Sequence, residues 1–191
     1  MARPKTISDD EVLRVARELF REKGHTASTR AVAEAAGISE AILYQRFNSK
    51  DELFFRAMHS TGPDLEEILG PDQPIDDARE YLCGVVVRAG KHFVSVIPLG
   101  LQVMMHPSFN RQKLGPIGGP NELKTGLIGR LESLVKRKRM AVVNPAMAAR
   151  LLLSVAHDWA LGQSLRPGPA AKGISDLEEL FEVVWMGLRG K

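Results

Sequence analysis

Cysteine is nearly absent from this sequence, since Cys83 is the single example among 191 residues. The chain therefore cannot form an internal disulfide, and a reducing compartment such as the cytoplasm suits it. Cys83 opens the apolar stretch Cys-Gly-Val-Val-Val. We accordingly interpret it as a buried, inert thiol and not as a redox sensor.

Long uncharged hydrophobic runs are also lacking. The start, MARPKTISDDEV, contains no apolar segment of the signal-peptide kind, and no stretch reaches the roughly 18 uncharged apolar residues that cross a bilayer. We therefore expect a soluble, cytoplasmic protein with no membrane partner.

A large excess of either charge is absent too. The 26 Lys and Arg residues face 23 Asp and Glu residues, which gives a net charge of +3. Such a small net charge permits a nucleic-acid partner without requiring one. Within residues 1–60 the two signs are nearly balanced, so any basic surface there must come from arrangement.

The residue sets that carry metal or enzyme chemistry are missing as well. His92 and His106 have no Cys or carboxylate partners at zinc-like spacing. His157 and Asp158 are adjacent, and neighbouring helical positions point about 100° apart, so these two side chains do not converge. The sequence shows no Gly-rich phosphate-binding motif. We expect no metal, no cofactor and no enzymatic activity.

Helical periodicity covers most of the chain, whereas strand-like alternation is almost missing, and this predicts an all-α fold. Ser8 with Glu11 forms a capping box before an amphipathic helix that Gly24 ends. A further capping box, Ser49 with Glu52, opens a helix that reaches about residue 59. Four helices are thus expected in the first sixty residues.

The Gly- and Pro-rich stretch TGPDLEEILGPDQP then breaks the helical pattern near Gly62. We place a small N-terminal domain at 1–60 and a larger helical domain at 61–191. The basic run 136–139 is interpreted as a solvated helix end. In the larger domain we expect helices over 75–96, 99–105, 121–139 and 145–165, then a last helix capped by Ser175 and Glu178.

Residues 28–53, STRAVAEAAGISEAILYQRFNSKDEL, show the pattern of a helix-turn-helix, with the motif itself at about 28–47. Ala33 supplies a small residue where the two helices meet, Gly37 permits the tight turn, and Ile38 is an apolar plug. Ser39 caps the second helix. That helix is amphipathic, and two of its residues are expected to face inward: Leu43 and Phe47.

The remaining side chains of the second helix are expected to face a major groove of DNA. Gln45 and Arg46 are suited to base edges, whereas Tyr44 and Lys50 are suited to phosphates. The predicted DNA-contacting residues are Ser28, Thr29, Arg30, Ser39, Glu40, Ala41, Ile42, Tyr44, Gln45, Arg46 and Lys50.

Two neighbouring features add to this surface. Ser28 or Thr29 opens the first helix of the motif with a hydroxyl and free backbone amides, which favour an anion such as a phosphate. Arg3 and Lys5 lie in an N-terminal arm that is expected to follow the DNA backbone or enter a minor groove.

Over roughly residues 8–58 the chain resembles the N-terminal signature of the TetR family. The resemblance is carried by Gly24, Thr29-Arg30-Ala31-Val32-Ala33, Ala36-Gly37-Ile38-Ser39, Leu43-Tyr44, Phe47 and Lys50. It implies a three-helix DNA-binding domain joined to a divergent helical domain for ligand and dimer contacts. It also implies a regulator that usually represses and that leaves operator DNA when a small molecule binds.

The chain departs from the family pattern at two positions of the second helix. Ile42 stands where a small hydroxyl residue is common, and Arg46 stands where His or Tyr is common. We therefore expect Ile42 to touch a thymine methyl or a sugar and not to donate to a phosphate.

The last two helices carry more apolar surface than one chain easily covers. A twofold dimer, in which both helices of each chain form a four-helix bundle, would cover it. Two helix-turn-helix motifs at fixed spacing would also read a palindrome. The alternative, that both helices are internal to a monomer, stays open.

Apolar residues on segments expected to surround a cavity, with one histidine at its polar rim, are the candidates for binding a small hydrophobic effector. The alternative is that they are ordinary core side chains. The candidates are Phe93, Leu101, Met104, Met105, His106 and Trp159.

The leading hypothesis is therefore a dimeric repressor that a small hydrophobic effector releases from a palindromic double-stranded operator. A dimeric DNA-binding regulator that is gated by a partner protein, or not gated at all, is the first alternative. A helical enzyme with an incidental helix-turn-helix is the second, although the sequence offers no convergent nucleophile, base or metal set.

Overall fold

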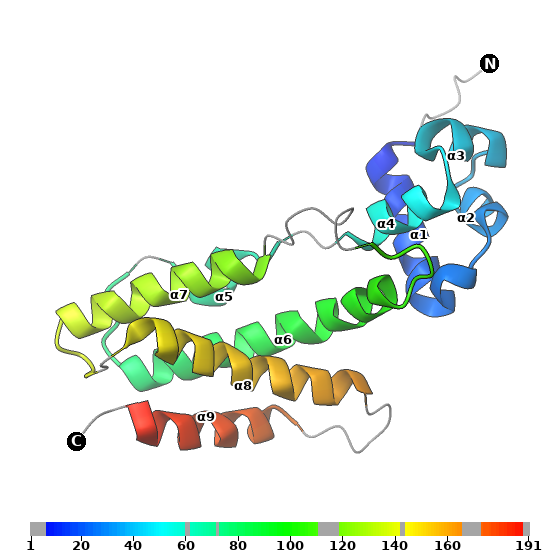
Figure 1. Cartoon of the computed structure of the whole chain (residues 1–191). Coiled ribbons are helices and arrows are strands. Elements are labelled where there is room, and N and C mark those ends of the chain that lie inside the picture. Colours follow the sequence, from blue (N-terminus) through cyan, green and yellow to red (C-terminus); the bar gives the residue numbers. More distant parts are fainter. Residues whose placement is uncertain are drawn as a thin grey trace. The chain divides into compact units, whose positions relative to one another are not determined.

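The computed structural model describes residues 7–59, 62–71, 73–110, 119–141, 144–165 and 173–188. Every regular element in these ranges is a helix and none is a strand (Figure 1), which confirms the predicted all-α fold. The chain divides into two compact units. The first comprises Met1–Ser60 and Pro98–Gly115, and the second comprises Thr61–Ile97 and Pro116–Lys191.

The described residues of the first unit include four complete α-helices and one short 3-10 turn. A serine precedes each α-helix and accepts a hydrogen bond from a backbone N–H three residues further on, which satisfies an amide that would otherwise lack a partner. The elements are α1 (Asp9–Lys23), η1 (Gly24–Thr26), α2 (Thr29–Ala35), α3 (Glu40–Phe47) and α4 (Lys50–Met58).

Aromatic and aliphatic side chains from all four helices form the core of this unit. The Phe20 ring of α1 meets the Phe54 ring of α4 edge to face, with 5.0 Å between centroids. Val32 of α2 and Leu43 and Phe47 of α3 are buried in the same core. The orientation of α3 is thus fixed by the apolar face that it buries.

Pro98–Gly115 also belongs to the first unit, although the predicted N-terminal domain ended at residue 60. Leu99 and Val103 are buried in its core. The side-chain amide of Gln102 donates to the carbonyl oxygen of Arg21, at 3.0 Å. Periodicity in the sequence indicates which face of a helix is apolar but not which core that face packs against. The sequence therefore placed Pro98–Gly115 in the predicted domain 61–191.

Helix α6 (Ala78–Met104) is continuous, where we predicted separate helices over 75–96 and 99–105. Pro98 lies in the gap between the two predicted helices, and a proline lacks the N–H of the helical hydrogen bond and crowds the preceding turn. Ala89 and Leu99, on the two sides of Pro98, are both buried. Packing along the helix therefore outweighs the lost hydrogen bond.

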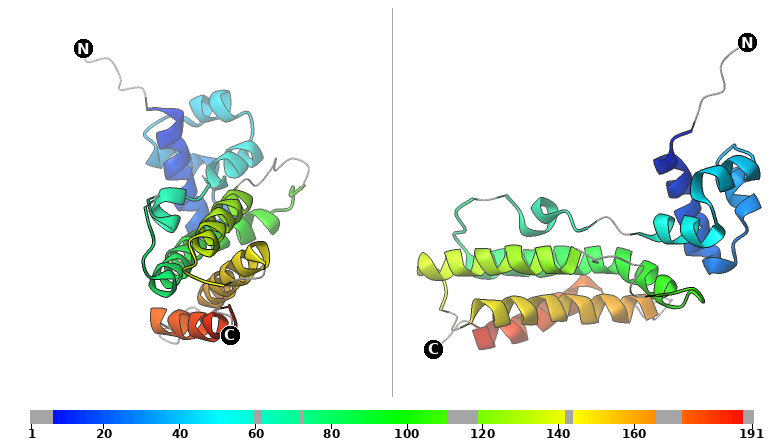
Figure 2. Two further views of the ribbon diagram at one scale, coloured as in Figure 1. Left: turned by 90° about the vertical axis from the view of Figure 1, so that its left-hand side faces the viewer. Right: turned by 45° about the horizontal axis from the view of Figure 1, so that its top comes forward.

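The second unit contains the helices α5 (Leu65–Leu69), α7 (Gly119–Lys136), α8 (Pro145–Leu165) and α9 (Ile174–Leu188), together with the Ala78–Ile97 part of α6. Helix α8 packs against α7 on one side and α9 on the other, as both views of Figure 2 allow the reader to follow. Leu127, Leu152 and Phe181, one from each of these helices, are fully buried.

Helix α5 lies inside the stretch where we predicted only a break. Asp64 caps its first turn by accepting from the N–H of Glu67. Its last carbonyls are also satisfied, since Arg88 donates to Ile68 and Tyr81 donates to Leu69, at 2.8 and 2.9 Å. These distant donors are the reason that local Gly and Pro content misled the prediction.

Two other boundaries differ from prediction. Helix α7 covers Gly119–Lys136 instead of 121–139, and the positive φ of 57° at Lys138 closes its end. Helix α9 begins at Ile174, so Ser175 lies inside the helix and is not its cap; the carbonyl of Gly173 accepts from the N–H of Asp176. The basic run 136–139 does lie at a helix end, where Arg139 faces Asp76 at 3.4 Å.

Among the described helices, α6 alone is long and apolar enough to cross a membrane by length and composition. Core helices pass the same test. Four of its residues, Leu82, Val85, Val86 and Ala89, are buried in the second unit's core. Cys83 is half-buried beside them, and burial raises the pKa of its thiol, which fits the interpretation of an inert cysteine.

Candidate nucleic-acid interface

Helices α2 and α3 form a helix-turn-helix whose turn depends on Gly37. Its φ of 68° lies in the left-handed region, which glycine adopts without the strain that a Cβ causes. The N–H of Ile38 donates to the carbonyl of Ala33, at 3.0 Å, and closes the turn. Ala33 is buried and Ile38 packs against the same core, as the sequence predicted.

Helix α3 has one buried and one exposed face. Leu43 and Phe47 are each 1% exposed and hold the helix on the core. At 100° per residue, Ala41 and Gln45 point almost directly away from them. Ile42 and Tyr44 lie beside this pair and are 40% and 43% exposed. We call these exposed residues the outer face of α3: Ala41, Ile42, Tyr44 and Gln45.

The first flank of α3 is tied to α2. Thr29 is only 7% exposed, and its hydroxyl donates to the carboxylate of Glu40. The same hydroxyl lies 3.2 Å from the hydroxyl of Tyr44. Thr29 and Glu40 are both predicted to contact DNA, and in the structure they are hydrogen-bonded to each other between the two helices of the motif.

The second flank of α3 is tied to the start of α1. The guanidinium of Arg46 donates to the carbonyl of Ile7 at 2.8 Å and to the carboxylate of Asp9 at 3.4 Å. The Arg46 side chain is only 22% exposed. Partners 37 and 39 positions away thus hold the side chain that the sequence predicts to read base edges.

Asp9 extends this contact to α4. Its second carboxylate oxygen lies 3.9 Å from the guanidinium of Arg56, whose Cζ lies 4.8 Å from the centre of the Phe47 ring. One acidic residue thus joins arginines from α3 and α4, and a cation–π contact adds to the same junction. No local pattern in the sequence relates Asp9 to Arg46, so this role of Asp9 becomes visible only in the folded chain.

The other predicted DNA-contacting residues surround the motif. Ser28, Arg30 and Ser39 are exposed, and the two serine hydroxyls cap α2 and α3. Lys50 is half-buried at the first position of α4. Arg3 and Lys5 lie outside the described residues.

The six candidates for effector binding do not share a unit. Phe93 and Trp159 pack against the core of the second unit. Four candidates belong to the first unit: Leu101, Met104, Met105 and His106. Met104 and Met105 are 57% and 79% exposed, so no described residue of that unit encloses them.

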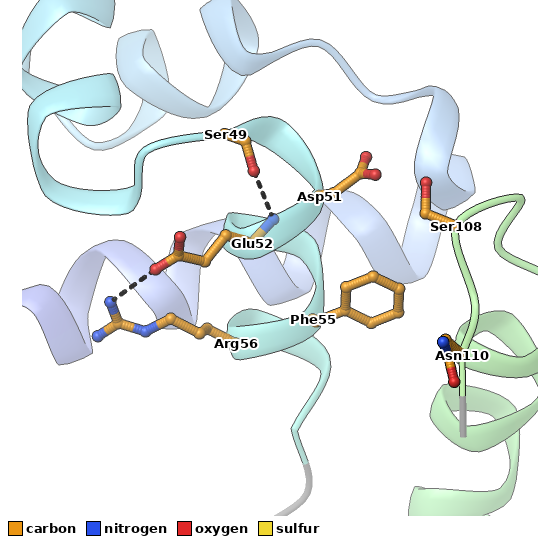
Figure 3. Close-up of a pocket in the computed structure, with 7 residues that line it drawn as sticks. All are labelled: Ser49, Asp51, Glu52, Phe55, Arg56, Ser108 and Asn110. Carbon is orange, nitrogen blue, oxygen red and sulfur yellow. Dashed lines mark hydrogen bonds and ion pairs between the residues drawn. The ribbon is translucent and has the colours of Figure 1, made fainter. Parts of the chain in front are cut away.

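A shallow hollow in the first unit has a volume of about 400 Å³. It is bordered by α4 and the segment that follows α6 (Figure 3), and its lining includes Asp51, Glu52, Arg56 and Ser108. The Glu52 carboxylate lies 3.9 Å from the Arg56 guanidinium across one turn of α4. The ring of Phe55 lines the same hollow, so charged and aromatic groups meet there.

His106 is buried in the first unit among aromatic rings. Its ring lies 4.5 Å from Phe54 and 4.9 Å from Phe55, between centroids. Nδ1 accepts from the N–H of Ser108 at 3.1 Å, and Nε2 lies 3.7 Å from an oxygen of Asp51. These contacts hold the segment after α6 on α4, a structural role for which the spacing of residues in the sequence carries no signal.

A comparison with protein families matches residues 12–57 to the N-terminal model described as "Bacterial regulatory proteins, tetR family". The matched range contains α2, the turn and α3. It therefore covers the part of the chain that carries the predicted motif.

Solved structures of transcriptional regulators share the fold over nearly the whole chain. A putative TetR-family regulator from Mesorhizobium loti is 18% identical, with a TM-score of 0.72 and coverage of 94% of this chain and 93% of that one. A TetR/AcrR-family regulator from Thermobifida fusca is 18% identical, with a TM-score of 0.68 and coverage of 96% and 100%. FadR from Bacillus subtilis, in complex with stearoyl-CoA, is 15% identical, with a TM-score of 0.67 and coverage of 95% and 100%.

Proposed function

We propose that this chain is a TetR-family transcriptional regulator that represses transcription as a dimer bound to a palindromic operator, from which a small hydrophobic effector releases it. The outer face of α3 carries the proposal. It is an exposed surface on a short helix that is fixed by its buried face and by ties on both flanks. A rigid helix of this kind fits a major groove without first becoming ordered.

We assign DNA contacts by exposure. Gln45, Ala41 and Ile42 are placed against base edges, because they point away from the core. Arg30 and Lys50 are placed near phosphates, where a cation fixes register without reading sequence. Thr29, Glu40 and Arg46 are assigned to holding α3 in position.

Dimerisation is proposed to use α8 and α9, which pack against each other within the second unit. Their apolar side chains are only partly covered. Val183 and Met186 of α9 are 71% and 65% exposed, and Met147 and Leu151 of α8 are 49% and 45% exposed. A twofold arrangement that brings α8 and α9 of two chains together would cover these side chains.

An effector site is proposed beside Trp159 in the second unit. Its indole Nε1 is buried and has no hydrogen-bond partner among the described residues. The ring packs closely on α6, where a Cβ added at Gly90 would lie 3.3 Å from it. An apolar molecule with an acceptor oxygen would satisfy this N–H, and the stearoyl-CoA bound by the FadR relative is a molecule of that chemistry.

The operator proposal is tested by incubating the purified protein with fragmented genomic DNA of its source and sequencing what it retains at near-physiological salt. We expect enrichment of fragments that share a palindrome. Gln45→Ala should weaken the enrichment, because the polar group at the centre of the outer face is gone. Gln73→Ala, the same change at an exposed position of the second unit, should keep it. A folded wild-type protein that enriches nothing would overturn the proposal.

The effector site is tested with Trp159→Phe, which keeps an aromatic ring but removes the N–H. Stearoyl-CoA is the probe, and release from the operator is measured by fluorescence anisotropy. We expect wild type to be released, and the variant to need at least about fivefold more probe, from the loss of one hydrogen bond. Equal release of both proteins would contradict the assignment of Trp159, and no release of wild type would exclude this class of effector.

A further inference from the structure

We propose that the operator half-site is built around A·T pairs, with an adenine read by Gln45 and thymine methyl groups packed against Ala41 and Ile42. This inference rests on the proposed function, since it specifies what the outer face of α3 recognises.

The charged residues of α3 are withdrawn from the outer face. The Glu40 carboxylate accepts from the buried Thr29 hydroxyl. The Arg46 guanidinium donates to Ile7 and Asp9, and its side chain is largely covered. In major-groove recognition, arginine is the usual reader of guanine and a carboxylate is the usual partner of the cytosine amino group. Both residues suited to a G·C pair are therefore already engaged within the first unit.

The side chains that remain exposed on the outer face of α3 are suited to an A·T pair and not to a G·C pair. A glutamine amide both donates and accepts, and so matches N7 and the N6 amino group of adenine. Gln45 is exposed at the centre of the outer face, one turn after Ala41. Tyr44 lies at the side, with its hydroxyl near that of Thr29. Gln45 is thus the one member of the outer face with a polar group at its centre.

Ala41 and Ile42 give this face an apolar edge. Ile42 is 40% exposed although it is a large hydrophobic residue. Ala41 is short, so it allows the helix to approach the base edges closely. Thymine is the base that offers a methyl group in the major groove, and covering it removes apolar surface from water on both sides of the contact.

The test uses selection from random double-stranded DNA, followed by competition binding with modified sites. Replacing a contacted thymine by uracil removes only the methyl group. We expect about a three- to fourfold loss of affinity for each such methyl, the value of one buried methylene. Ile42→Ala should bind the thymine and uracil sites with nearly equal affinity, because it no longer covers the methyl.

Variants at position 45 test the adenine contact. Gln45→Ala should reduce discrimination against replacement of the contacted A·T pair by at least about fivefold, and Gln45→Arg should shift the preference there to G·C. Arg46→Ala is the matched comparison. It should weaken binding to all sites alike without changing the preferred base at any position.

The outcomes separate this inference from the proposed function. A selected palindrome whose Gln45-dependent pair is G·C, or whose affinity does not change from thymine to uracil, would overturn the inference alone. A guanine preference that disappears in Arg46→Ala would do the same. Failure of the wild-type protein to select any sequence would overturn the proposed function, and this inference with it.

Discussion

At the scale of single residues, His106 shows how a titratable side chain becomes part of a core. The rings of Phe54 and Phe55 cover it, and Asp51, His25 and Lys50 are the charged or titratable groups that face it. Burial lowers the pKa of His106, while the Asp51 carboxylate opposes the change. The neutral imidazole is therefore the form that the folded unit prefers.

This preference predicts a pH dependence of stability. Because the unfolded chain binds a proton at His106 more readily than the folded one, the contribution is present above the unfolded pKa and is lost as pH falls through the folded pKa. We expect the free energy of unfolding, measured with urea, to fall between about pH 7.5 and pH 5.5. The free energy of unfolding of the His106→Gln variant should fall less over the same pH range. An equal decrease in both proteins would mean that His106 is not the source of the pH dependence. Burial also lowers the pKa of His92, so His92→Gln is measured in the same way to distinguish the contributions of the two histidines.

At the scale of elements, the turn between α2 and α3 depends on backbone conformation and not on space. Gly37 has a φ of 68°, yet nothing lies within 4 Å of a Cβ added there. A side chain at this position therefore meets no neighbour, and its cost comes from the left-handed backbone alone.

We expect Gly37→Ala to lower the free energy of unfolding by about 1–2 kcal/mol. Gly37→Asn should cost less, since asparagine tolerates this conformation better. The matched control is Gly129→Ala in the middle of helix α7, where nothing lies within 4 Å and the helix should gain about 0.5–1 kcal/mol. Thermal and urea unfolding measure all three. A loss at Gly129 as large as that at Gly37 would contradict the conformational explanation.

At the scale of the whole molecule, the chain carries two cores that use different stretches of one long helix. The Ala78–Ile97 part of α6 contributes to the second unit and its remainder contributes to the first. The second unit also leaves apolar side chains of α8 and α9 exposed. The proposed dimer is the assembly that would cover them.

Val183→Glu tests that assembly, because it places a carboxylate at a position that is 71% exposed in the single chain. We expect the dimer dissociation constant, measured by sedimentation equilibrium, to rise at least about tenfold, since an unpaired charge in an interface is costly. Operator affinity should fall with it. Met105→Glu, the same kind of change at a 79% exposed residue of the first unit, should leave the dimer intact. Unchanged association of the Val183 variant would exclude this surface.

The sequence by itself determined the features that depend on near neighbours. The serine caps of α1, α3 and α4 follow from a hydroxyl placed before an amphipathic run, and each is present. The turn at Gly37 and the inward face of α3 follow from spacing in the same way. These local patterns were enough to predict an all-α chain with an N-terminal helix-turn-helix.

Only the tertiary structure decided which of the outward-looking residues are free. Arg46 and Glu40 carry the charges expected at a DNA surface, but Asp9 and Thr29 engage them from other helices. The first unit also recruits Leu99 and Val103 from beyond a proline that seemed to end a helix. Local rules describe the helix to which a residue belongs, whereas a hydrogen bond or a buried contact also depends on a partner that the chain brings from far along the sequence.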